Sequence, residues 1–520
     1  MSLLRNFIAV GGSTMTSRLL GFVRDMVMAA ALGTGPVADA FLVAFRLPNL
    51  FRRLFAEGAF ASAFVPLFAR ALEGEGTEAA RRFGSEALSA LLALLIAVTL
   101  LALIGMVPLT YVMAPGFVSD PEKFDLTVLL ARIAFPYLAL VSLLALYGGV
   151  LNARGRFLAA ALAPGLLNIV LVAALASILL FRRENSAEAG ILLACATLVG
   201  GVLQLSLVMI AARRDGMRLP LRAPKLTGGV RRLVALALPG LIAGGATQIN
   251  IVVGTMIASF APGAIAVLGY ADRLYQLPLG IVGATIAVVM LPDIARHLRG
   301  GRDDLACHTQ NRSLELAMAL TLPAAIALFV LAKPIVAVIY QRGAFGPDDT
   351  IATARTLMAF SAGLPAFVLV KVFSPGFFAR EDTRAPMAFA TIGVGINIVL
   401  SLALFPTFAS MGIALATSMA GWINAGLLAA SLHRRGHLLL DERVRRNLPL
   451  ALAAALTMGG GVFLAAWWAA PLLADQRTLV KAAALAAICI SGLCLYAALC
   501  QTTGLVDVRI MIARVTKHRR

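Results

Sequence analysis

The stretch AFRLPNLFRRLFAEGAFASAFVPLFAR, residues 44–70, returns in altered form as YADRLYQLPLGIVGATIAVVMLPDIAR, residues 270–296. In this alignment Arg46 matches Arg273, at an offset of 227 residues. Both stretches place arginine inside a segment that is otherwise rich in apolar residues. The match indicates that one structural unit is present twice in the chain.

A second pair of stretches supports this repeat. NARGRFLAAALAPGLLNIVL, residues 152–171, aligns with FAREDTRAPMAFATIGVGINIVL, residues 378–400, and Arg154 matches Arg380 at an offset of 226 residues. Two matches at nearly the same offset are hard to obtain by chance in a helical chain. We therefore expect the chain to contain two copies of one multi-helix unit, followed by an additional C-terminal segment.

The composition places the chain in the membrane-protein class. Of its 520 residues, 60% are hydrophobic and 14% are charged, and the mean hydropathy is +0.89. A soluble domain of this composition would expose far too much apolar surface. The net charge of +19 fits arginine-rich cytoplasmic loops, and no nucleic-acid-binding pattern accompanies it.

Motifs for catalysis or cofactor binding are absent from the sequence. It contains no GxSxG, HExxH or Walker A pattern, and its five cysteines form no CxxC pair. We therefore expect no enzyme activity, no cofactor, no metal and no disulfide. A cleavable signal peptide is not expected either, because the first apolar stretch continues through Arg18 and Arg24.

Hydrophobic stretches of about 20 residues, bounded by charges or by Pro and Gly, predict fourteen transmembrane helices. Their expected ranges are 7–32, 37–69, 83–113, 126–150, 157–181, 188–211, 229–259, 264–295, 312–340, 349–378, 386–405, 410–432, 447–473 and 478–503. The fold class is thus all-α and polytopic. Helices 1–6 and 7–12 would be two parallel repeats, and helices 13 and 14 are extra.

Loop charges predict the orientation in the membrane. Connections after even-numbered helices and the two termini hold 29 Lys and Arg residues, whereas the other connections hold 6. This bias places both termini in the cytoplasm. The expected organisation is a six-helix bundle (1–212), a cytoplasmic linker (213–228), a second bundle (229–435), helices 13 and 14 (436–503) and a basic tail (504–520).

Ten of the 45 Lys and Arg residues fall inside the predicted helices, and five of these ten lie in helices 1 and 2. The five are Arg18, Arg24, Arg46, Arg52 and Arg53. A charged side chain at the membrane centre costs at least about 2.5–3.5 kcal/mol. Five cations on neighbouring helices are expected to face water or to bind an anion.

The nearby acids are fewer, so pairing explains only part of this charge. Arg53 and Glu57 are four residues apart, and a local ion pair is the simplest interpretation for these two. Asp25 lies in helix 1 and Asp39 lies at the connecting loop. Because guanidinium groups grip phosphate oxygens in a bidentate manner, a hydrated cavity for a phosphate-bearing ligand is the favoured hypothesis. Structural pairing of all the arginines is the alternative.

The run GGSTMTSRLLGFVRDMVMAAALGTGPVADAF, followed by RLPNLFRRLFAEGAFASAFVPLF, closely resembles the start of the MurJ/MviN lipid II flippases. GYADRLYQLPLGIVG in the second repeat is also similar to this family, which belongs to the multidrug/oligosaccharidyl-lipid/polysaccharide exporter superfamily. The resemblance extends over the whole chain. It implies two six-helix bundles in a V around a central cationic cavity, with helices 13 and 14 flanking a groove for a lipid tail.

The resemblance also implies roles for particular residues. Arg18 and Arg24 of SRLLGFVRD and Arg52 of LFRRLFAEG match the cavity arginines of the family, and Arg273 of ADRLYQLP matches their partner from the second half. Asp39 of VADAF matches the acidic position of the family near the first loop. The remaining candidates in the same motif are Arg53 and Glu57.

The implied activity is transport. The chain would move lipid II, the undecaprenyl-pyrophosphate-linked disaccharide-pentapeptide, from the inner to the outer leaflet of the bacterial cytoplasmic membrane by alternating access. Its partners would be lipid II, membrane lipids and cell-wall synthases, with no nucleic acid. The alternatives are a flippase for another polyprenyl-linked glycan, a drug/cation antiporter of the same superfamily, and a non-transporting scaffold of cell-wall synthesis.

Overall fold

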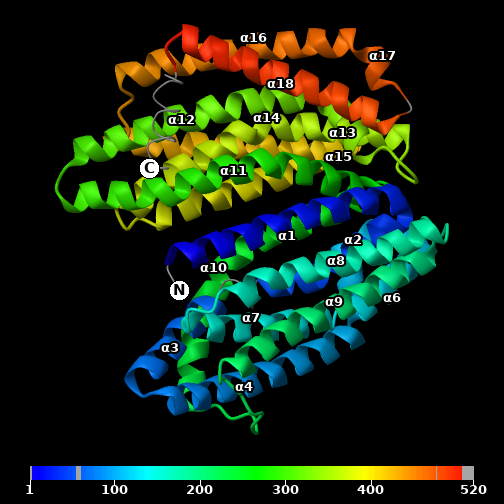
Figure 1. Ribbon diagram of the computed structural model, residues 1–520, viewed down its shortest axis with the longest axis vertical. Helices are drawn as coiled ribbons and strands as arrows, with labels where there is room; N and C mark the ends of the chain where they lie inside the picture. The colour runs from blue at the N-terminus through cyan, green and yellow to red at the C-terminus, as the bar shows by residue number, and fades with distance from the viewer. Residues whose placement is uncertain (1–2, 54–59, 476, 506–520) are drawn as a thin grey trace. The chain divides into compact units, whose positions relative to one another are not determined.

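The computed structural model describes residues 3–53, 60–475 and 477–505, and only the backbone of residues 3–10, 240–247, 281 and 283–289. The described residues form helices joined by short loops, with no strand among them (Figure 1). The all-α prediction is therefore confirmed for this part of the chain. The structure divides into two compact units, residues 1–266 with 342–346 and residues 267–341 with 347–520.

The first unit is built from ten α-helices and one short 3₁₀ helix within the described residues. They are α1 (Leu3–Leu32), α2 (Pro36–Arg52), α3 (Ala61–Gly74), α4 (Thr77–Ile104), α5 (Met106–Met113), η2 (Pro115–Ser119), α6 (Pro121–Ala134), α7 (Tyr137–Ala153), α8 (Leu158–Leu180), α9 (Ala187–Arg214) and α10 (Gly228–Ala258). Helix α8 packs between α1 and α9, while α2 packs on α6 (Figure 1). This packing brings α1, which carries Arg18 and Arg24, against α8.

The second unit contains the remaining helices. They are α11 (Ala264–Arg299), α12 (Asp303–Val330), α13 (Ala332–Tyr340), α14 (Pro347–Phe378), α15 (Arg384–Arg434), α16 (Glu442–Trp468), α17 (Ala470–Leu473) and α18 (Thr478–Thr502). The first residues of α11, up to Ala266, belong to the first unit. Helix α14 packs on α12 and α15, and α16 packs on α12 and α18. The extra C-terminal helices α16 and α18 thus rest on α12.

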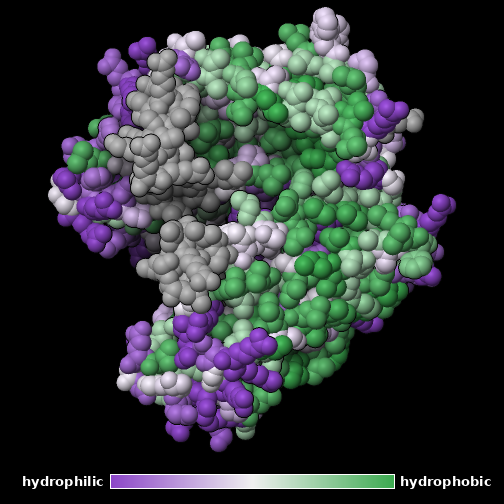
Figure 2. Space-filling model, in the orientation of Figure 1, coloured by the Kyte–Doolittle hydropathy of each residue, from purple (hydrophilic) through white to green (hydrophobic). Residues whose placement is uncertain are grey.

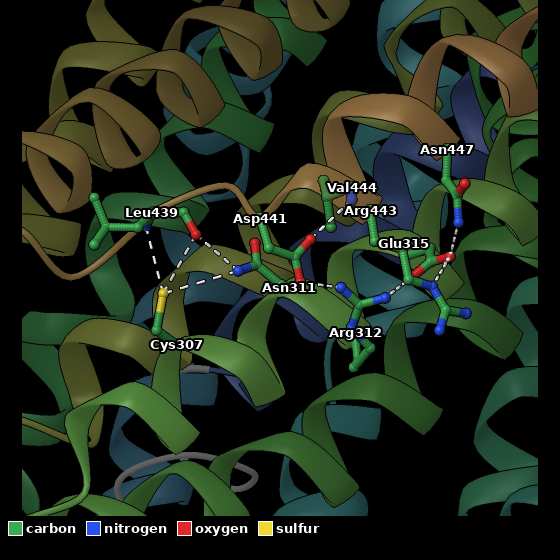
Figure 3. A network of polar contacts seen from close by, with 9 residues as sticks. All are labelled: Cys307, Asn311, Arg312, Glu315, Leu439, Asp441, Arg443, Val444 and Asn447. Atoms are coloured by element: carbon green, nitrogen blue, oxygen red, sulfur yellow. Dashed lines mark hydrogen bonds and ion pairs between the residues drawn. The ribbon is translucent and has the colours of Figure 1, made fainter.

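A polar network joins the start of α16 to α12 (Figure 3). Arg312 donates to both Glu315 and Asp441, and Asp441 caps α16 by accepting from the Val444 N–H at 2.8 Å. Arg443 donates to Glu315 at 3.2 Å, and Asn447 donates to the same carboxylate. Because two arginines and an amide surround it, the largely buried Glu315 carboxylate is well compensated.

The predicted helix ranges match observed helices, but several predicted single helices are divided. The range 126–150 is split into α6 and α7 at Phe135 and Pro136, where proline cannot continue the hydrogen-bond ladder. Two predicted helices, 386–405 and 410–432, form α15 and are separated by Ala409, whose φ of 46° breaks the helix. These breaks allow the chain to bend or reverse without a long loop.

Nine helical segments of the described residues are long and apolar enough to cross a membrane. They include α4, α8, α9, α14 and α18. On the face shown in Figure 2, hydrophobic residues cover the sides of α8 and α9, whereas hydrophilic residues gather near helix ends. The chain is therefore a multi-pass membrane protein, as its composition predicts. The total of fourteen spans and the predicted domain boundaries stay predictions.

Candidate functional site

Arg24 is held in the first unit by a short polar chain that links α1 to α8. Its Nη2 lies 2.6 Å from Oδ1 of Asp25, and its Nη1 donates to Oδ1 of Asn168 at 3.1 Å. The Nδ2 of Asn168 in turn donates to the carbonyl oxygen of Ser17 at 3.1 Å. Asn168 thus uses both ends of its amide to bind α1. The guanidinium group is fixed in orientation, with only 15% of the side chain exposed.

Arg52 lies at the end of α2 and is half-buried. Its Nε donates to Oδ1 of Asn49 at 3.0 Å, one helical turn earlier. The phenol of Tyr137, which is 3% exposed, lies within electrostatic range of both Arg52 and Arg24. Tyr137 is fixed by its hydrogen bond to Gln204 at 3.3 Å. Arg24 of α1 and Arg52 of α2 therefore share one neighbourhood around Tyr137 of α7.

The other arginines of these two helices differ in exposure. Arg18 and Arg53 are exposed, whereas Arg46 is half-buried and donates to the buried hydroxyl of Thr255 at 2.6 Å. Thr255 belongs to α10, so Arg46 connects α2 to that helix. Arg18 lies on α1 six residues before Arg24, and its side chain is exposed.

Asp39, in the first turn of α2, has no exposed surface. Its Oδ2 accepts from Nζ of Lys123 at 2.8 Å and from the N–H of Gly263 at 2.9 Å, and its Oδ1 accepts from the N–H of Ala266 at 3.0 Å. Lys123 also lies 3.9 Å from the centre of the Phe117 ring. In this structure the carboxylate is occupied by three donors, two of them backbone groups.

Lys123 is one of the six Lys and Arg residues expected in the connections after odd-numbered helices, and its placement in a loop was wrong. Lys123 lies in the first turn of α6, is 8% exposed and pairs with Asp39. Between residues 18 and 53 the chain carries five arginines and two acids, Asp25 and Asp39, and Asp39 is paired with Lys123. Arginines therefore outnumber acids in this part of the sequence.

Two predicted site residues lie elsewhere. Arg273 is half-buried on α11 of the second unit. Glu57 lies outside the described residues, so its predicted pairing with Arg53 is not tested. Among the predicted residues, the structure thus brings Arg24 and Arg52 into a common neighbourhood within the first unit.

Comparison with known proteins decides the family. Residues 28–473 match the model of a family described as "Lipid II flippase MurJ". A "Probable lipid II flippase MurJ" from Rhizobium tropici is 48% identical, over 100% of this chain and 98% of its own length. The chain belongs to the MurJ lipid II flippase family.

Solved structures agree on the fold of this family member. "Lipid II flippase MurJ, inward closed conformation" has a TM-score of 0.78 at 24% identity and covers 95% of this chain and 98% of its own. A multidrug resistance MATE family transporter in an inward-facing conformation has a TM-score of 0.65 at 14% identity, covering 83% and 98%. At these identities the structures show the fold alone.

Several residues around Arg24, Arg46 and Arg52 were not predicted as site residues. Asn168, Tyr137 and Thr255 each place a polar group next to an arginine of α1 or α2. For Asn168 a signal was available, since it is a polar residue in an apolar helix and aligns with Asn397 of the second repeat. Asn397 instead accepts from Thr417 at 3.2 Å, so the repeat position has a different partner there.

Proposed function

We propose that this MurJ family member moves lipid II from the inner to the outer leaflet of the bacterial cytoplasmic membrane by alternating access. The pyrophosphate of the head group would be bound by Arg18, Arg24 and Arg52. The observation that carries this proposal is the fixed Arg24 guanidinium group, held by Asp25 and Asn168 in a stretch of sequence where arginines outnumber acids. A diphosphate is the ligand class that such a group binds best.

The chemistry supports a pyrophosphate over a simple carboxylate. A guanidinium group whose orientation is fixed before binding loses little conformational entropy when it grips an anion. Asp25 and Asn168 contact Nε, Nη1 and Nη2 of Arg24, so an incoming phosphate has to share or replace the Asp25 contact. The exposed Arg18 can supply further charge. This exchange permits binding that is firm but reversible, as a transport cycle requires.

The role of Arg273 as a further pyrophosphate contact rests on the sequence repeat that aligns it with Arg46. We also propose the finer architecture of fourteen spans in two six-helix bundles, with both termini in the cytoplasm. The charge bias of the loops supports that orientation. For Asp39 we propose a role in fixing α2, because three donors already occupy its carboxylate.

The proposal is tested with the full chain reconstituted in liposomes that carry lipid II in both leaflets. A membrane-impermeant enzyme that cleaves the head group is added outside. In vesicles without protein about half of the lipid II should be protected, whereas the transporter should expose all of it. Arg24→Ala removes a charged bidentate contact worth about 1.5–3 kcal/mol, so the rate should fall by about tenfold or more.

Arg183→Ala is the matched control for charge removal. Arg183 is 60% exposed and pairs with Glu188 outside the helices that carry the candidate site, so this variant should transport like the unmodified chain. Equal protection with and without protein would refute the transport proposal and favour a scaffold. Faster transport of a different polyprenyl-pyrophosphate-linked glycan would refute lipid II as the preferred substrate.

A further inference from the structure

A charged cluster ties the end of α9 to the loop that precedes α8 in the first unit. Asp215 follows α9 directly and accepts from Nε of Arg154 and, at 3.0 Å, from Nε of Arg156. Nη2 of Arg154 also donates to the Asp215 backbone carbonyl at 3.1 Å. Burial alone would raise the pKa of Asp215, but the bonds from both arginines hold it below its ordinary value. We call these three residues the α8–α9 brace.

The second unit has an ion pair at the corresponding places, with the charges exchanged. Asp382 lies in the loop before α15, and Arg435 follows α15 directly. Nη1 of Arg435 donates to Oδ2 of Asp382 at 2.7 Å, while Oδ1 of Asp382 accepts from the N–H of Ala385 at 3.0 Å. The guanidinium group of Arg435 also lies 5.4 Å from the centre of the Phe377 ring.

The sequence repeat relates these two pairs. At the offset of 226 residues that aligns Arg154 with Arg380, Arg156 aligns with Asp382. Asp215 and Arg435 are both the first residue after the last helix of their repeat. The same two positions therefore carry Arg and Asp in one unit but Asp and Arg in the other. A pair that is kept while its polarity is reversed indicates a requirement for the connection itself.

The α8–α9 brace fixes the start of α8, and Asn168 of α8 accepts a hydrogen bond from Arg24 of α1. Helix α8 begins at Leu158, two residues after Arg156, and packs on α1 and α9 (Figure 1). Ten residues further along α8, Asn168 makes its two bonds to α1, both at 3.1 Å. Hydrogen bonds weaken steeply with displacement, so a small shift of α8 would release Arg24. We propose that Asp215 is a positioning residue for the anion-binding arginine Arg24, acting through α8 and Asn168.

This inference rests on the proposed function, and binding of undecaprenyl pyrophosphate to the purified full-length chain tests it. Asp215→Arg places three cations together, and their repulsion should shift the start of α8. The affinity for undecaprenyl pyrophosphate should therefore weaken by about fivefold. The double variant Arg156→Asp with Asp215→Arg reproduces the polarity of the second unit and should restore the affinity. Asp215→Asn is a milder change for use if Asp215→Arg fails to fold, and it should weaken binding in the same direction.

A double-mutant cycle separates positioning from general loss of stability. In an Asn168→Ala background, Asp215→Arg should no longer change the affinity, although it should still lower the thermal stability. Asp382→Asn breaks the corresponding pair of the second unit and should lower stability without changing the affinity. The inference is overturned if Asp215→Arg still weakens the affinity fivefold in the Asn168→Ala background. It is also overturned if the double variant Arg156→Asp with Asp215→Arg does not recover the affinity. If the unmodified chain binds no undecaprenyl pyrophosphate, the proposed function itself fails.

Discussion

The buried pair of Asp39 and Lys123 allows a direct test of what holds α2 in place. Lys123→Met keeps most of the side-chain volume but removes the ammonium group that lies 2.8 Å from the Asp39 carboxylate. Asp39 has no exposed surface, so water cannot take the place of Lys123. The two backbone N–H groups of Gly263 and Ala266 remain as donors but carry no net charge.

The magnitude follows from this environment. Breaking a buried ion pair by removing one partner costs about 3–5 kcal/mol, because the other charge stays buried without compensation. Lys123→Met should therefore lower the free energy of unfolding by about this amount, and Asp39→Asn should cost a similar amount by leaving Lys123 unpaired. The double variant buries neither charge, so its cost should be at least about 2 kcal/mol smaller than the sum of the single costs.

Equilibrium unfolding in mixed micelles gives the free energy of unfolding of the unmodified chain, the two single variants and the double variant under one condition. A loss of less than about 1 kcal/mol for Lys123→Met would be typical of an exposed ion pair and would refute the burial argument. Additive single costs would show that the two side chains do not interact. Arg183→Ala breaks the exposed pair with Glu188 and serves as the reference, with an expected change near zero.

Three further predictions concern other parts of the chain. Ala409→Gly should raise the unfolding free energy by about 1 kcal/mol, because the φ of 46° strains any residue with a Cβ, whereas Ala414→Gly within the helix should lower it. Asn168→Ala should weaken undecaprenyl pyrophosphate binding by about tenfold in a titration, and equal affinity would contradict the role of its amide. Burial and the neighbouring Arg380 and Arg435 lower the pKa of His437 below 6.5, so the folded state resists its protonation. Stability should therefore fall as the pH drops below about 6.5, and His437→Gln should remove this part of the pH dependence in thermal unfolding scans.

Much of the fold could be predicted because its signals are local. Apolar stretches of about 20 residues marked the helices, since every backbone polar group inside a membrane has to be bonded within its own segment. The break at Phe135 and Pro136 also had a local signal, because proline inside a helical stretch is a plausible site for a kink. Ala409 gave no signal, since alanine normally continues a helix.

By itself, the sequence determined the membrane class, the helical segments, the family and the concentration of arginines on α1 and α2. These properties depend on composition and on spacing along one helix. The tertiary structure alone decided which groups those charges meet. Asn168 lies 144 residues from Arg24, and Lys123 lies 84 residues from Asp39. Partners so distant are chosen by how helices pack, and apolar helix surfaces permit many packings from the same pattern of residues.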